Sequence, residues 1–146
     1  MESCILFLIV GNEIQWCQLR QNATSELLDH NKSLLVISGQ IGMRQDGFVP
    51  KEQSQQFSLA LDNIRKNVEA QGLSVSDIIK MTFYWGGETL PAEERNLILT
   101  PWLQGHQPCM TMVTVKGLAR PDLLIEIEAF AEGKIANSDN KYSARS

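Results

Sequence analysis

The sequence is poor in the side chains that enzymes use most often for catalysis. Only two histidines occur among its 146 residues, His30 and His106, so a site that needs several imidazoles cannot come from one copy of the chain. The three cysteines, Cys4, Cys17 and Cys109, are odd in number and have no C-x-x-C spacing. They predict reduced thiols rather than a disulfide framework or a zinc knuckle.

Common signatures of other functions are also missing. There is no G-x-S-x-G, G-x-G-x-x-G or H-E-x-x-H motif and no P-loop, so nothing predicts a metal or a cofactor. The net charge of -4 argues against nucleic acid as a partner. The apolar run from Cys4 to Val10 follows no Lys or Arg and is far shorter than the roughly 20 residues of a membrane span. We therefore expect a cytoplasmic protein with no membrane partner.

What is present fits one globular domain. Hydrophobic residues make up 43% of the chain and charged residues 21%, as in soluble proteins. Residues 1–22 are predicted to be an amino-terminal extension with extra strands at 4–10 and 13–19. The domain is expected over 23–133, and the polar segment 134–146 is predicted to be a frayed tail.

The clearest element is a helix. Apolar residues recur at helical spacing from Phe57 to Val68, between Pro50 and Gly72, which mark its two ends. A second, shorter helix is expected over 91–99, stopped by Pro101.

Strands are predicted where apolar, β-branched or aromatic residues cluster or alternate: 25–28, 34–37, 78–85, 110–115 and 124–130. In the last of these, Ile125 and Ile127 share one face and Glu126 and Glu128 share the other. The order of elements predicts an α+β fold with two helices on one face of a mixed sheet. The second face then needs a cover, which favours a subunit interface.

Glu126 and Glu128 are the one carboxylate pair that suggests chemistry, and two interpretations stay open. Both can be solvated on an exposed sheet face, or one can lie in an interface pocket and act as an acid or base. The glycines of Ser38-Gly-Gln-Ile-Gly42 allow a ligand to approach the backbone closely. A dyad of His106 and Cys109 is disfavoured, because such near neighbours in a loop rarely have the geometry of a base and its nucleophile.

Three segments occur together in a recognisable order: Leu35-Val-Ile-Ser-Gly-Gln-Ile-Gly42, the stretch from Gln56 to Gly72 with Asp62-Asn-Ile64, and Ile125-Glu-Ile-Glu-Ala-Phe-Ala131. Asn96 and Pro108 lie between the last two. From about Ser25 to Ala131 the sequence thereby resembles the RidA family, also called the YjgF or endoribonuclease L-PSP family. The resemblance implies a chorismate-mutase-like fold assembled as a homotrimer. Its three sheets form a central barrel, and ligand clefts lie between subunits.

The resemblance also implies an activity. The best-known family members hydrolyse enamines and imines, such as 2-aminoacrylate, to ketoacids and ammonia; some relatives have been described as ribonucleases or translation inhibitors. By residue-by-residue match, Ser38, Gly39 and Asn96 line the cleft, and Glu126 orients a water or shuttles a proton. Glu128 matches a second glutamate with a structural role.

One matched position differs from the family pattern. Deaminating members have Pro-Ala-Arg before the fifth strand, and that arginine holds the substrate carboxylate; here the segment is Pro108-Cys-Met110. Methionine offers an apolar surface and no charge. The family's tyrosine, which falls near Ser25, is missing too. Arg44 and His106 are alternatives for the lost cation, although an exposed loop side chain is the simpler interpretation of Arg44.

The first functional hypothesis is therefore an arginine-lacking RidA-family homotrimer. It binds, and as an enzyme hydrolyses, a small carbonyl, imine/enamine or amide metabolite in an intersubunit cleft lined by Ser38, Gly39, Asn96, Met110 and Glu126. Glu126 is the expected catalytic group, and standard 2-aminoacrylate deaminase activity is not expected. The alternative is a non-enzymatic small-molecule-binding or protein-interaction module. A ribonuclease or translation inhibitor is a third hypothesis, against which the acidic charge counts.

Overall fold

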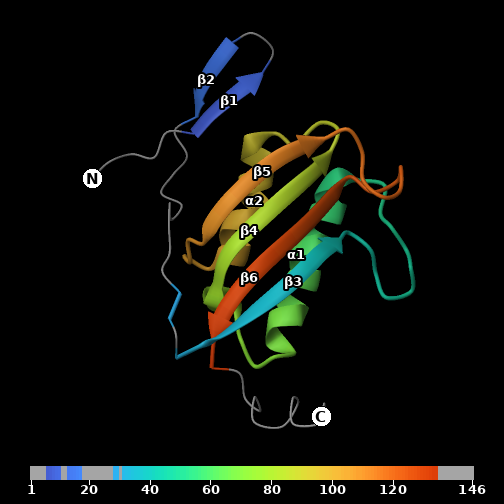
Figure 1. The fold of residues 1–146 in the computed structure, drawn as a ribbon. Helices are drawn as coiled ribbons and strands as arrows, with labels where there is room; N and C mark the ends of the chain where they lie inside the picture. Colours follow the sequence, from blue (N-terminus) through green and yellow to red (C-terminus); the bar gives the residue numbers. More distant parts are fainter. Residues whose placement is uncertain (1–5, 11–12, 18–27, 30, 135–146) are drawn as a thin grey trace, which may run out of the picture.

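A four-stranded mixed sheet with two helices on one face forms the main body of the chain (Figure 1). The computed structural model describes residues 6–10, 13–17, 28–29 and 31–134. The predicted α+β architecture is confirmed. The strand predicted over 25–28, apart from Leu28, and the tail predicted over 134–146, apart from Lys134, lie outside the described residues.

The strands of this sheet run in the order β3-β6-β4-β5. β3 (Ser33–Ile41) is antiparallel to β6 (Ile125–Gly133), and β6 is antiparallel to β4 (Ile78–Gly86). β4 is parallel to β5 (Cys109–Val115), and a parallel pair needs a crossover connection, which α2 (Ala92–Leu103) supplies. β3 and β5 are therefore the two edges of the sheet.

The core lies between the sheet and α1 (Gln53–Glu69), the long helix that the apolar spacing predicted. The Phe57 ring of α1 lies 6.1 Å from the Phe83 ring and 5.2 Å from the Trp85 ring, centroid to centroid. Burying aromatic side chains of this size is worth roughly 2–3 kcal/mol each. The buried strand residues alternate as expected: Met81, Phe83 and Trp85 on β4, and Ile125, Ile127, Ala129 and Ala131 on β6.

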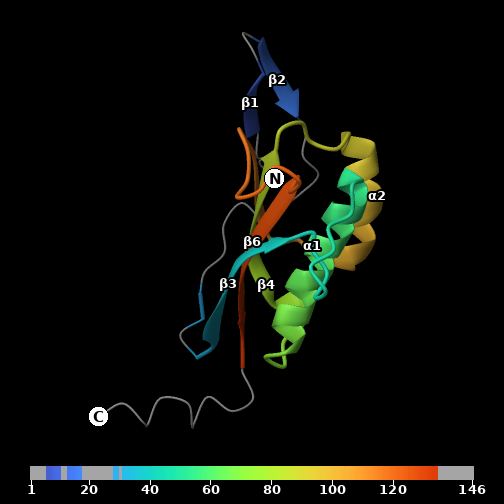
Figure 2. The ribbon, with the colours of Figure 1, turned by 90° about the vertical axis from the view of Figure 1, so that its right-hand side faces the viewer.

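The intervening strand residues project from the other face, which neither of the two described helices covers (Figure 2). We call this surface the open face. Two of its apolar side chains are strongly exposed, Leu34 at 46% and Val36 at 61%. The open face comprises Leu34, Val36, Ser38, Lys80, Thr82, Tyr84, Thr111, Val113, Glu126, Glu128 and Phe130. Such a mixed apolar and polar surface is suited to an interface.

The predicted end of the second helix is wrong. α2 continues through Pro101 to Leu103 and ends at Gln104, whose backbone is left-handed with φ 50°. Proline has no N–H, so including Pro101 removes one backbone hydrogen bond to the preceding turn of the helix. Because Trp102 and Leu103 pack against the hydrophobic core, the last turn is held by its side chains.

The first two strands form a separate two-stranded sheet. β1 (Leu6–Val10) pairs antiparallel with β2 (Glu13–Cys17), with Leu6 opposite Cys17. Whether these two strands lie at the edge of the main sheet or over a cleft stays a prediction. Among the described residues, no helix combines the length and apolar character needed to cross a membrane.

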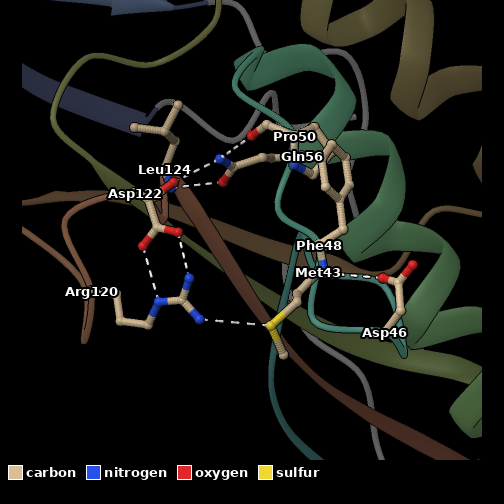
Figure 3. A network of polar contacts seen from close by, with 8 residues as sticks. All are labelled: Met43, Asp46, Phe48, Pro50, Gln56, Arg120, Asp122 and Leu124. Carbon is tan, nitrogen blue, oxygen red and sulfur yellow. Dashed lines mark hydrogen bonds and ion pairs between the residues drawn. The ribbon is translucent and has the colours of Figure 1, made fainter.

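A buried glutamine on α1 joins the loop that follows β3 to the loop that precedes β6 (Figure 3). Gln56 of α1 donates from Nε2 to the carbonyls of Pro50 and Asp122, both at 2.8 Å, and its Oε1 accepts from the Leu124 N–H at 2.8 Å. Gly42, at the end of β3, packs so closely that a Cβ there would lie 2.5 Å from the Gln56 Cα. The chain just before β6 is thus fixed by the Gln56 side chain, and the chain just after β3 packs against the Gln56 backbone.

An ion pair extends this network. Arg120 binds the Asp122 carboxylate through Nε at 3.0 Å and through Nη2, and its Nη1 lies 3.9 Å from the Met43 sulfur. The hydrogen bond from Arg120 holds the pKa of Asp122 below its usual value of 3.8. Since the pair is exposed, it orients the loop more than it stabilises the fold.

Replacing Gln56 with leucine tests this role. Gln56→Leu keeps the volume but leaves the Leu124 N–H and two carbonyls without partners, so we expect a loss of about 2–3 kcal/mol in the free energy of unfolding. Urea denaturation measures it. The exposed neighbour Gln55→Leu is the matched control and should change the free energy by less than about 0.5 kcal/mol. Equal effects of both substitutions on the free energy of unfolding would contradict this role of Gln56.

Candidate functional site

The Glu126 side chain leaves β6 on the open face and lies across Gly39 of β3. A Cβ on residue 39 would lie 1.8 Å from the Oε1 of Glu126, so the carboxylate occupies space that only glycine leaves free. The β3–β6 register shifts between Ile37 and Gln40, which takes Ser38 and Gly39 out of the regular ladder. The predicted site residues Ser38, Gly39 and Glu126 therefore lie on adjacent strands at one edge of the sheet.

The second glutamate is held by a tyrosine. The Tyr84 hydroxyl donates a hydrogen bond to Glu128 Oε1 at 2.8 Å. This hydrogen bond is the main reason that the pKa of Tyr84 lies above its ordinary value of 10.0; partial burial and the negative charges of Glu128 and Glu126 add to it. Among the described residues, no hydrogen bond reaches the Glu126 carboxylate, although Tyr84 is its cross-strand neighbour. Of the two carboxylates, Glu126 is the one available to a ligand.

The other two predicted site residues lie elsewhere in the same copy. Asn96 is exposed on α2, which lies on the helix-covered side of the sheet (Figure 2). Met110 is half-buried on β5, where it packs against the hydrophobic core. β5 is the edge opposite β3. One chain thus supplies two separate groups of predicted site residues: Ser38, Gly39 and Glu126 on β3 and β6, and Asn96 and Met110 on α2 and β5.

The two alternative cations are both engaged. The Arg44 guanidinium lies 4.5 Å from the centroid of the Phe48 ring and lines a shallow groove beside α1 with Asn63 and Lys66. The Nε2 of His106 lies 2.5 Å from the Ile78 carbonyl and ties the loop before β5 to the start of β4. Both contacts have structural roles. Within residues 28–29 and 31–134 and the two short strands before them, no cluster of three or more His, Cys, Asp or Glu could hold a metal ion.

Two polar contacts of the open face were not predicted from the sequence. One is the Tyr84–Glu128 bond, and the other is the hydrogen bond that Lys80 Nζ donates to Thr111 Oγ1. Each joins residues more than 30 positions apart, so it depends on the strand order and register. A usable signal for Lys80 was present, since it is the one Lys or Arg in any of the four strands of the sheet.

The close approach of Glu126 to Gly39 can be tested by adding a side chain at residue 39. Gly39→Ala would place a Cβ 1.8 Å from Oε1 and 2.5 Å from Cδ of Glu126, so we expect it to cost about 1–3 kcal/mol in the free energy of unfolding. Most of that loss should disappear in a Glu126→Ala background, where the space is free. A double-mutant cycle by urea denaturation measures the coupling.

Gly117→Ala is the control for this cycle, because a Cβ there meets no atom within 4 Å. It should show no coupling to Glu126→Ala. Additive effects of Gly39→Ala and Glu126→Ala would contradict the contact.

Comparison with known proteins identifies the family. The endoribonuclease L-PSP family profile matches residues 22–133. The 2-iminobutanoate/2-iminopropanoate deaminase of Escherichia coli K12 is 40% identical over 103 residues, covering 68% of this chain and 79% of that protein. The crystal structure of Escherichia coli TdcF with bound serine aligns with a TM-score of 0.62 at 32% identity, covering 75% of this chain and 90% of that chain. A Rid-family protein from Yersinia pestis, YyfB, aligns with a TM-score of 0.60 at 26% identity, over 67% and 77% of the two chains. This chain therefore belongs to the endoribonuclease L-PSP family, the RidA/YjgF family that its sequence resembles.

Proposed function

We propose that this protein binds and hydrolyses a small carbonyl, imine/enamine or amide metabolite in a cleft between two copies of the chain, with Glu126 as the acid–base group. The observation that carries this proposal is the position of Glu126. Its carboxylate lies against the backbone of Gly39 with no hydrogen bond from another described residue. Its neighbour Glu128 is occupied by Tyr84. A carboxylate in this state can accept a proton from a bound water and return it later.

The division of the site residues supports a cleft between copies. Asn96 and Met110 cannot join Ser38, Gly39 and Glu126 within one chain, but the β5 side of one copy can meet the β3 side of the next. The exposed apolar side chains of the open face, Leu34 and Val36, also favour a cover by further copies. A homotrimer is the assembly that the family resemblance implies, and we propose it here.

The proposed chemistry needs one water for each imine. The water oxygen bonds to the imine carbon while Glu126 accepts one water proton and passes it to nitrogen, which gives a carbinolamine. Glu126 then takes the hydroxyl proton and passes it to nitrogen as the carbon–oxygen double bond forms and the carbon–nitrogen bond breaks. Ammonia leaves, and a carbonyl compound remains. An enamine first gains a proton on carbon and loses one from nitrogen to become the imine. Ser38 and the backbone of Gly39 lie where they can orient the bound ligand.

Met110 sets this protein apart from arginine-bearing relatives. It offers the ligand no charge, and its side chain packs against the core. Losing one charged anchor costs on the order of 2–5 kcal/mol of binding free energy. Turnover of 2-aminoacrylate should therefore be much slower than in relatives with arginine at this position.

Ammonia release from 2-aminoacrylate tests the proposal. We expect Met110→Arg to raise the rate at least about tenfold, because an arginine at this strand edge can extend its guanidinium to the cleft while its stem packs where methionine did. Adding Glu126→Gln to this variant should abolish the gain. The exposed α2 residue Glu94→Gln is the control and should leave the rate unchanged.

The same experiment separates the second candidate function, a non-enzymatic binding module. That candidate is favoured by the absence of a charged side chain at Met110. If Glu126→Gln folds normally and no rate changes in either background, Glu126 is not an acid–base group and the enzymatic proposal is wrong. A native rate equal to that of arginine-bearing relatives would contradict the argument from Met110.

A further inference from the structure

The β3 strand carries one extra residue at the candidate site, because its register against β6 shifts between Ile37 and Gln40. We call the two residues inside this shift, Ser38 and Gly39, the bulge. Since side chains alternate along a strand, an extra residue exchanges the faces of the residues that follow it. Gln40 is therefore paired with the buried Ile127 and belongs to the helix-covered side of the sheet, where α1 lies.

The Gln40 carboxamide closes the bulge and ties it to α1. Its Nε2 donates a hydrogen bond to the Ser38 carbonyl at 3.0 Å and lies 3.5 Å from the Gly39 carbonyl. Its Oε1 accepts a hydrogen bond from Asn67 Nδ2 at 3.2 Å. These partners fix the orientation of the amide, because a flipped Gln40 would place oxygen against a carbonyl and nitrogen against a nitrogen.

Two asparagines one helical turn apart on α1 hold this end of β3. Asn67 Nδ2 donates to Gln40 and also to the Asn63 carbonyl, at 2.9 Å, so both of its N–H groups are used. Asn63 Nδ2 donates to the carbonyls of Ile41 and Met43, both at 3.0 Å. Asn63 thus holds the chain after the bulge, and the link from Asn67 to Gln40 holds the bulge itself.

The position of the bulge decides where the Glu126 carboxylate can lie. Its Oε1 lies in the space that a Cβ on Gly39 would fill, so a movement of the bulge changes the surface against which the carboxylate packs. We infer that Gln40 and Asn67 are positioning residues, which hold the bulge where Glu126 rests on Gly39 and faces a ligand beside Ser38. This inference goes beyond the proposed function and rests on it only for the reaction that Glu126 performs.

The effect of Gly39→Ala on unfolding reports the position of the bulge. The added Cβ meets the Glu126 carboxylate, so we expect it to lower the urea midpoint of unfolding. Gln40→Leu or Asn67→Leu should free the bulge to move away, and the midpoint shift caused by Gly39→Ala should then fall at least about twofold. Gln55→Leu removes an exposed amide from the same helix and is the matched control, which should leave the shift unchanged.

Turnover separates positioning from stability alone. In the Met110→Arg background, Asn67→Leu should lower kcat for 2-aminoacrylate at least about fivefold and change KM by less than about twofold, because the ligand contacts remain while Glu126 is displaced. Circular dichroism at the assay temperature checks that the variant is folded. Gln55→Leu in the same background should leave both constants unchanged.

The inference is overturned if the midpoint shift caused by Gly39→Ala is the same with and without Gln40→Leu and Asn67→Leu. It is also overturned if folded Asn67→Leu protein keeps the full kcat of the Met110→Arg background. If that background shows no turnover that depends on Glu126, the proposed function fails. The urea midpoints then decide by themselves whether the two amides hold the bulge.

Discussion

The contact between Glu126 and Gly39 is the constraint on which the candidate site depends. Residue 39 has no side chain, so the carboxylate can lie across β3 instead of extending into solvent. Two features of the fold set up this contact. The alternation of β6 buries Ile125 and Ile127 against the helices and so turns Glu126 to the open face. The buried Gln56 then fixes the start of β6 through the Leu124 N–H.

The same sheet is the basis of the proposal that one copy holds only part of the site. Ser38, Gly39 and Glu126 lie at the β3 edge, whereas Met110 and Asn96 lie at or behind the β5 edge. No other described strand pairs with β3 or β5 at the edges of this sheet, and no described helix covers its open face, so under the proposal a second copy brings these groups together. Under this proposal, the scarcity of histidine in the chain is no obstacle, because each copy contributes only part of the chemistry.

Local pattern was sufficient to predict much of the fold. The apolar spacing from Phe57 to Val68 predicted α1, and the alternation around Glu126 predicted both the strand and its two faces, because these patterns depend only on neighbouring residues. The predicted end of α2 was wrong, because the packing of Trp102 and Leu103 against the core outweighs the backbone hydrogen bond that Pro101 removes from the helix.

The parts of the site that escaped prediction are those set by register. The sequence shows Tyr84 and Glu128 only as residues 44 positions apart, and nothing local says that β4 and β6 are neighbours. Likewise, the strand over 110–115 was predicted, but the packing of Met110 against the core depends on residues far away in the sequence.

The central claim is that the site is completed between copies of the chain, and the mass in solution tests it most directly. Sedimentation velocity of the purified protein should give three times the chain mass of 16.4 kDa. The mass should persist on dilution to the concentrations used in binding and rate measurements. A mass of 16.4 kDa under those conditions would contradict the account, because Glu126 would then have no partner copy to bring Asn96 and Met110 to it.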